Sequence, residues 1–229
     1  MPESWYWNEF ALTGTDYGSV EEVAVYDRRM AQVRDVAAEN RAILAALDLP
    51  SEARVIEMGC GTGAFSVMAA AQCRKVVAVD ISRMMLSYVE TRAKREGVAN
   101  IEYCHGGFLT YEHKGAPVDA VVSGLALHHL PDFWKSVALR RIAAMLKPGG
   151  RLFLMDVVYS FETTPEEFFP SFVNGMPETM RSHTTDHVGR EYSTWDWIMR
   201  GLLERAGFTI EDAKFENGWI ARYLCRKTS

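Results

Sequence analysis

Short runs of consecutive apolar residues alternate along the chain with longer amphipathic segments whose apolar positions recur at a helical period. Strands that are apolar on consecutive positions need cover on both faces, which is typical of a parallel sheet flanked by helices. The alternation therefore predicts an α/β fold with a doubly wound, mostly parallel sheet and helices on both faces. The predicted strands are 55–58, 76–79, 101–104, 118–123 and 151–155, and the predicted helices are 64–72, 83–96 and 132–145.

The regions before the first strand and after the fifth strand lack this alternation. Ser19 and Glu22 form a predicted capping box, and helical periodicity follows as far as Pro50. Residues 158–192 carry three prolines and several phenylalanines without a strand signal, which indicates a helical cap inserted after the fifth strand. We expect one domain with four parts, namely an N-terminal helical segment, a core, the cap and a C-terminal end, at residues 1–50, 51–157, 158–192 and 193–229.

The C-terminal part is predicted to contain a helix and two antiparallel strands. Ser193 and Asp196 form a second predicted capping box, and the helix that follows is expected to end at Gly207. Segments 208–215 and 219–226 flank an Asn-Gly pair, which suits the type I′ turn of a hairpin. With this hairpin the predicted sheet has seven strands.

The composition of the chain is useful mainly because it excludes several classes of protein. The chain has 229 residues, of which 48% are hydrophobic and 24% charged, and its net charge is -5, as in an ordinary globular domain. The acidic balance argues against nucleic acid as a partner. No apolar run approaches the ~20 residues of a membrane span, and the N-terminus does not resemble a signal peptide. The four cysteines form no C-x-x-C pair, so we expect a cytoplasmic protein with reduced thiols.

The clearest candidate chemistry lies at the carboxyl end of the first strand. Gly59, Gly61 and Gly63 follow that strand and open a helix, an arrangement that lets a ligand lie against bare backbone. Asp80 ends the next strand, where a carboxylate can hold both hydroxyls of an adenosine ribose. Dinucleotide-binding folds share these features. Glu57, however, would repel a pyrophosphate and would favour an ammonium or sulfonium group.

Four segments resemble the motifs of class I S-adenosylmethionine-dependent methyltransferases. They are residues 55–63, Asp80 within Val-Asp-Ile-Ser, residues 119–130 and residues 146–152. The resemblance implies S-adenosylmethionine as cofactor, S-adenosylhomocysteine as product, and methyl transfer by in-line displacement that rests on positioning and exclusion of water. Because the chain is acidic and lacks RNA-reading elements, we expect the acceptor to be a small molecule.

The resemblance also implies which residues surround the cofactor. They are Tyr26, Glu57, Gly59, Cys60, Gly61, Gly63, Asp80, Ile81, Met85, Gly107, Phe108, Ser123, Gly124 and Leu125. Asp80 would bind the ribose, Ile81 and Met85 would flank the adenine, and Tyr26 would lie over the cofactor. One position departs from the family pattern, because the acid that usually accepts from the adenine amino group is replaced here by Gly107. Backbone groups and the Phe108 ring are the expected substitutes.

Two pairs of histidines are candidates for a role in catalysis or substrate binding. His128 and His129 follow the fourth strand, and His129 is expected to act as a base or to orient the acceptor, with a structural histidine as the alternative. His183 and His187 lie four residues apart in the cap, but Pro177 and Gly189 argue against a long helix there. We therefore expect no metal site and interpret these cap histidines as substrate contacts or loop residues.

Three features leave alternatives open. An NAD-linked oxidoreductase shares the glycine loop and the ribose acid, although Glu57 disfavours it. A non-catalytic cofactor-binding protein of the same fold would keep the same binding residues, so only turnover separates it from an enzyme. The cap aromatics are predicted either to wall the acceptor pocket or to pack the cap onto the sheet; they are Phe161, Phe168, Phe169 and Phe172.

Overall fold

The structure is a computed structural model that describes residues 5–11 and 20–228, without the side chains of residues 20–24. Within this range the elements in chain order are α1 (Val20–Met30), α2 (Val36–Leu47), β1 (Arg54–Met58), α3 (Ala64–Ala70), β2 (Lys75–Asp80), α4 (Arg83–Arg95), β3 (Ile101–His105), β4 (Val118–Gly124), the 3-10 helix η1 (Leu127–His129), α5 (Asp132–Met145), β5 (Leu146–Tyr159), α6 (Pro165–Gly175), α7 (Glu178–Arg190), β6 (Thr194–Trp195), α8 (Asp196–Arg205), β7 (Phe208–Glu216) and β8 (Ile220–Lys227).

The strands form one mixed sheet in the order β3-β2-β1-β4-β5-β8-β7. Strands β1 to β5 are parallel, and β8 runs antiparallel to both β5 and β7. The two-residue β6 pairs with β5 off this path, so the described sheet has one short strand beyond the seven predicted. The predicted fold class, a mostly parallel sheet that ends in an antiparallel hairpin, is confirmed.

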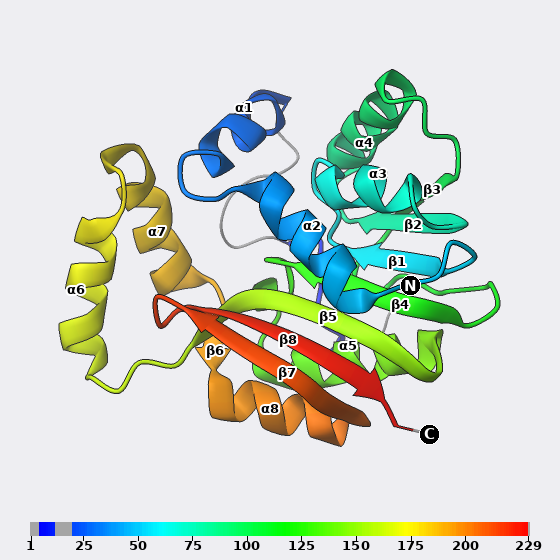
Figure 1. Ribbon diagram of the computed structural model, residues 1–229. Coiled ribbons are helices and arrows are strands. Elements are labelled where there is room, and N and C mark those ends of the chain that lie inside the picture. Colours follow the sequence, from blue (N-terminus) through cyan, green and yellow to red (C-terminus); the bar gives the residue numbers. More distant parts are fainter. Residues whose placement is uncertain (1–4, 12–19, 229) are drawn as a thin grey trace.

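Helices cover both faces of the sheet. Figure 1 shows α2, α3 and α4 on one side and α5 and α8 on the other, with α6 and α7 beyond the strand ends. Successive residues of β4 enter different cores: Val121 packs in the core on the α5 and α8 side, whereas Ala120 and Val122 pack in the core on the α2 and α3 side. This explains why the strands are apolar on consecutive positions.

Two boundaries differ from the prediction. The N-terminal helical region is divided into α1 and α2, because Asp35 caps α2 by accepting a hydrogen bond from the N–H of Ala38 at 2.9 Å. The expected cap at Ser19 lies outside the described residues. The second predicted capping box is wrong, because Ser193 Oγ instead bonds His187 Nε2 at 2.8 Å and Thr194 joins β6. The helix α8 therefore begins at Asp196 without a side-chain cap.

The cap consists of the two helices α6 and α7. Strand β5 continues to Tyr159, so the cap begins two residues later than predicted. Pro177 and Gly189 are expected to argue against a long helix here, and α7 is a helix of 13 residues: Pro177 is its N-cap, where no backbone N–H is needed, and Gly189 falls in its last turn. Among the described residues, no helix combines the length and apolar character needed to cross a bilayer.

Candidate functional site

A cavity at the carboxyl ends of β1 to β4, here called the main cavity, is lined by most of the predicted site residues. These are Tyr26, Gly59, Gly61, Asp80, Ile81, Met85, Gly107, Phe108, Gly124, Leu125 and His129. A neighbouring inner cavity is lined by Glu57 and Cys60 and shares Tyr26, Gly59, Gly61 and Gly124 with the main cavity. The topology thus gathers residues from strand ends that are far apart in sequence at one edge of the sheet.

The glycine loop needs glycine for two separate reasons. Gly59, Gly61 and Gly63 all have positive φ, at 71°, 50° and 74°. A Cβ atom on Gly59 would lie 2.4 Å from the Cβ of Ala126, and one on Gly63 would lie 2.4 Å from Cγ1 of Val89 in α4. The loop therefore packs directly against the segment after β4 and against α4, which fixes the shape of the cavity edge.

Asp80 is held by the backbone and still faces the main cavity. Its Oδ2 accepts from the N–H of Gly61 at 2.9 Å, and its Oδ1 accepts from the N–H of Ser82 at 2.8 Å. Burial raises the pKa of this carboxyl to about 6 despite these hydrogen bonds. Each carboxylate oxygen can accept more than one hydrogen bond, so Asp80 can also bind two hydroxyls of a ligand in the cavity.

Glu57 is a buried acid that faces the inner cavity. Burial raises the pKa of its carboxyl to about 8, and Ser66 Oγ donates to Glu57 Oε2 at 2.5 Å. In the part of the chain that the structure describes, no basic side chain forms an ion pair with Glu57. A cationic ligand in the inner cavity would therefore stabilise its ionised form.

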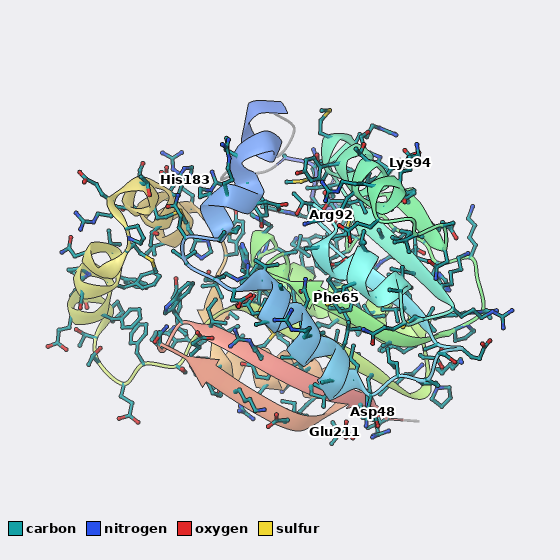
Figure 2. The ribbon with its side chains drawn as sticks, turned by 45° about the horizontal axis from the view of Figure 1, so that its top comes forward. Asp48, Phe65, Arg92, Lys94, His183 and Glu211 are labelled. Carbon is teal, nitrogen blue, oxygen red and sulfur yellow. The ribbon has the colours of Figure 1, made fainter. Side chains whose placement is uncertain are left out.

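Two contacts tie α1 to the glycine loop and to α4. Thr62 Oγ1 donates to Asp27 Oδ1 at 2.6 Å, and Arg92 of α4, labelled in Figure 2, forms an ion pair with Asp27 at 3.4 Å. These contacts hold the neighbouring Tyr26 where the cavities meet, because Tyr26 lines the main cavity, the inner cavity and a third cavity under the cap.

The third cavity, here called the cap cavity, lies between α1, the cap helices and the sheet. Residues from α1, α6 and α7 line it together with Leu125, Val157 and Trp219. His183, labelled in Figure 2 on α7, is one of these lining residues. Leu125, which follows β4, lines both the main and the cap cavity. It has a left-handed φ of 54°, a conformation that costs a non-glycine residue about 1–3 kcal/mol and is concentrated at functional sites.

The cap aromatics divide between the two predicted roles. Phe172 lines the cap cavity. Phe161 stacks on Phe168 with ring centroids 3.9 Å apart, and both rings contact Tyr159 at the end of β5. Phe169 also packs against Tyr159, with ring centroids 5.2 Å apart. Packing of the cap onto the sheet is thus the role of three of these residues, and Phe172 is the one that faces the cavity.

The two adjacent histidines face different cavities. His129 lines the main cavity. Its pKa is lowered to about 3, mainly by burial and secondly by the positive charge of His128. His128 lines the cap cavity, and its Nδ1 donates to Asp156 Oδ1 at 2.5 Å. Burial opposes a charge on His128, but Asp156 and Glu191 outweigh that effect and raise its pKa to about 9.

Two predicted site residues lie away from these cavities. Ser123 is fully buried within β4, and Gly63 faces Val89 at the packing contact with α4. Neither residue lines the main, inner or cap cavity.

The N-terminal segment supplies an acid that sequence reasoning missed. Glu9 is 7% exposed, lines the main cavity, and accepts hydrogen bonds from the backbone N–H of Leu109 at 3.0 Å and of Thr110 at 2.8 Å. A Cβ atom on Gly107 would lie 2.5 Å from Glu9 Oε2. The Glu9 carboxylate therefore occupies the space beside Gly107. The sequence contains one signal of this residue, because the absence of an acid at Gly107 indicates that another acid should be sought as the partner of the adenine amino group.

Known proteins resemble this chain in sequence. A model of the methyltransferase domain matches residues 55–150. An uncharacterized methyltransferase of Geobacillus sp. strain WCH70 is 26% identical over 190 residues, which cover 83% of this chain and 84% of that protein. Residues 55–150 therefore match a methyltransferase domain, and the chain has the fold of class I S-adenosylmethionine-dependent methyltransferases. Another uncharacterized methyltransferase, from Mycobacterium tuberculosis strain H37Rv, is 36% identical to this methyltransferase over 122 residues, about half the length of each chain.

A solved structure also shares the fold of this methyltransferase. The crystal structure of magnesium protoporphyrin IX methyltransferase from Synechocystis PCC 6803 with bound SAH matches with a TM-score of 0.68, covering 93% of this chain and 97% of that chain. The sequences are 19% identical, so the likeness shows the fold alone. The acceptor of this methyltransferase has to be argued from its own residues.

Proposed function

We propose that this methyltransferase binds S-adenosylmethionine across the main and inner cavities and transfers its methyl group to a small molecule in the cap cavity. The observation that carries the proposal is the pair of buried acids, Asp80 and Glu57, on adjoining cavities that share the glycine loop. A ligand that carries a ribose and, beyond it, a sulfonium and an ammonium group matches both acids.

Each end of the cofactor is matched by residues of a different kind. Asp80 accepts the ribose hydroxyls, while Glu57 and the backbone of Gly59 and Gly61 hold the methionine part. Ile81 and Met85 supply the apolar walls for the adenine. An NAD-linked reaction would instead place a pyrophosphate beside Glu57, where two negative charges would repel each other.

Glu9 is the proposed partner of the adenine amino group. Its carboxylate lies beside Gly107, where family members usually carry an acid. Its Oε2 accepts from the N–H of Leu109 and keeps acceptor capacity for an amino N–H of the ligand. The missing acid would thus be replaced by one from the N-terminal segment, rather than by backbone groups and Phe108 alone.

The chain's contribution to transfer is mainly positional. When bound, S-adenosylmethionine supplies a methyl group already activated by its sulfonium. Tyr26 and Leu125, which line both the main and the cap cavity, would align the two reactants and exclude water between them. Such alignment accounts for up to about 7–11 kcal/mol of a barrier. His129, which lines the main cavity, would orient the acceptor where it meets the methyl group, because its pKa of about 3 makes the imidazole a weak base. His128, held between Asp156 and Glu191, would fix the position of His129.

Thermal unfolding in the presence of ligands tests the cofactor assignment. Stabilisation by S-adenosylhomocysteine but not by NAD is expected, because a ligand at a hundred times its Kd adds about 2.7 kcal/mol to the free energy of unfolding. Glu57→Gln should reduce the shift, whereas Glu90→Gln, on the exposed surface of α4, should leave it unchanged. Stabilisation by NAD alone would contradict the proposal. Binding of S-adenosylhomocysteine without turnover on any acceptor would favour the non-catalytic alternative.

A further inference from the structure

Three side chains with metal-binding atoms converge on the wall of the cap cavity. His187 and Glu191 lie one helical turn apart at the end of α7, and His128 comes from η1 after β4. A nitrogen of each imidazole and an oxygen of the carboxylate all lie within 4.8 Å of one another. We propose that His128, His187 and Glu191 bind a divalent first-row transition-metal ion, with Zn²⁺ as the ion to test first.

The hydrogen bonds around the two imidazoles orient them toward a common point. His128 Nδ1 donates to Asp156 Oδ1 at 2.5 Å, and His187 Nε2 is paired with Ser193 Oγ at 2.8 Å. The opposite nitrogens, His128 Nε2 and His187 Nδ1, both face the same oxygen of Glu191. Metal-binding histidines are characteristically fixed in this way, with the outer nitrogen bonded to a carboxylate or another polar group.

The spacing and the ligand types suit a transition metal. Zinc bonds of about 2.0–2.2 Å in tetrahedral geometry place neighbouring ligand atoms about 3.3 Å apart. His128 Nε2 lies 3.2 Å from Glu191 Oε2, so this pair already has that separation. Two imidazoles and one carboxylate form a ligand set used by zinc and by ferrous iron, whereas calcium and magnesium prefer oxygen ligands alone.

The charges around the cluster also match a divalent ion. Asp156 is fully buried and Glu191 side-chain exposure is 6%, and the two carboxylates flank the His128 ring on its opposite nitrogens. In the described ranges, neither carboxylate forms an ion pair with a lysine or arginine, and the buried Lys135 is bonded to Asp132. When a metal ion displaces the proton that His128 carries between these carboxylates, the imidazoles are neutral and the cluster has two negative charges. A divalent ion would balance them.

The sites for the ion and for the proposed acceptor are adjacent. All three ligand residues line the cap cavity, so an ion held there would have coordination positions open toward the cavity. The inference does not require the methyl-transfer proposal, because the ligand atoms are independent of Asp80 and Glu57. In the absence of an ion the same side chains would form a hydrogen-bonded cluster, and this alternative must be separated by experiment.

Metal titration of the untagged protein distinguishes a metal site from a hydrogen-bonded cluster. After treatment with a chelator and dialysis, the protein should bind one equivalent of Zn²⁺, and Co²⁺ should give visible absorption bands of a low-symmetry nitrogen and oxygen site. His187→Ala and Glu191→Gln should weaken Zn²⁺ binding at least tenfold. His183→Ala is the matched control, because it removes the same type of residue from the same helix and cavity and should keep the wild-type affinity.

Several outcomes would overturn the site. Less than stoichiometric binding by the wild-type protein would do so, as would equal affinity in the wild-type and His187→Ala proteins. The wild-type stoichiometry and Co²⁺ spectrum decide the question even if a variant fails to fold. Thermal shifts with S-adenosylhomocysteine in the same samples keep the two proposals apart: cofactor binding without metal binding overturns only the metal site, and metal binding without cofactor binding overturns only the proposed cofactor.

Discussion

The cofactor side and the acceptor side of this methyltransferase are built in different ways. The main and inner cavities lie at strand ends, where Gly59 and Gly61 have positive φ and Asp80 accepts from the N–H of Gly61. The cap cavity is formed by side chains of α1, α6 and α7 that meet only in the folded chain. The cofactor side is therefore fixed by short motifs, whereas the acceptor side depends on tertiary packing and is free to differ between relatives of the same fold.

Gly59→Ala should have the largest effect on the cofactor side. The alanine would have to adopt the left-handed φ of 71°, and its Cβ would lie 2.4 Å from the Cβ of Ala126. We expect a loss of stability of about 1–3 kcal/mol and no measurable binding of S-adenosylhomocysteine in calorimetry. Gly97→Ala is the matched control: it has the same φ of 71°, but a Cβ there meets nothing within 4 Å. Normal cofactor binding by Gly59→Ala would show that the loop is not rigid.

Asp80→Ala should be the next largest change. It removes a charge-assisted contact to the ribose, which is worth about 1.5–3 kcal/mol, or roughly a ten- to 150-fold loss of affinity for S-adenosylhomocysteine. Isothermal titration calorimetry measures this directly, and circular dichroism checks that the variant is folded. An affinity within twofold of wild type would remove Asp80 from the ribose site.

Glu57→Gln should weaken the cofactor about tenfold and also change how stability depends on pH. The ordinary pKa of 4.5 is raised to about 8 in the folded protein. Between these values the folded state keeps a proton that the unfolded state has lost, so the stability of the ligand-free protein falls as the pH rises. The substitution should remove this fall and raise the thermal midpoint at pH 8. An unchanged pH profile would mean that Glu57 is ionised without a ligand.

Moving the carboxylate from position 9 to position 107 tests whether an acid recognises the adenine. Glu9→Ala should weaken S-adenosylhomocysteine up to tenfold, because the adenine amino group loses its proposed acceptor. Gly107→Asp alone should perturb the site, since its Cβ would lie 2.5 Å from Glu9 Oε2. Combining the two substitutions should recover affinity, with Glu9→Ala plus Gly107→Ala as the control that adds bulk without charge. Equal affinities for the two double variants would argue against an acid in adenine recognition.

The contrast between the two sides also explains what the sequence could predict. The strands, the loop from Gly59 to Gly63 and the hairpin at Asn217-Gly218 follow from local chemistry, and both turn residues have the positive φ that a type I′ turn requires. Glu9 could not be found in this way, because its position depends on packing of the N-terminal aromatics, such as Tyr6 against Trp134 at 4.8 Å. The same holds for His187 and Glu191, because their approach to His128 depends on where the end of α7 lies relative to η1 in the folded chain.

Substitutions in the cap should have the smallest effect on the cofactor. Phe172→Ala removes a ring from the cap cavity and should leave the affinity for S-adenosylhomocysteine within twofold of wild type. Phe161→Ala opens the aromatic cluster that joins the cap to Tyr159 and Trp195, and because Phe161 is only half-buried it should lower stability by about 0.5–3 kcal/mol. Calorimetry and thermal unfolding of both variants separate the two roles. If Phe172→Ala weakened the cofactor as much as Asp80→Ala does, the two sides would not be independent, because the cap would then hold the cofactor itself and an acceptor would have to enter by another route.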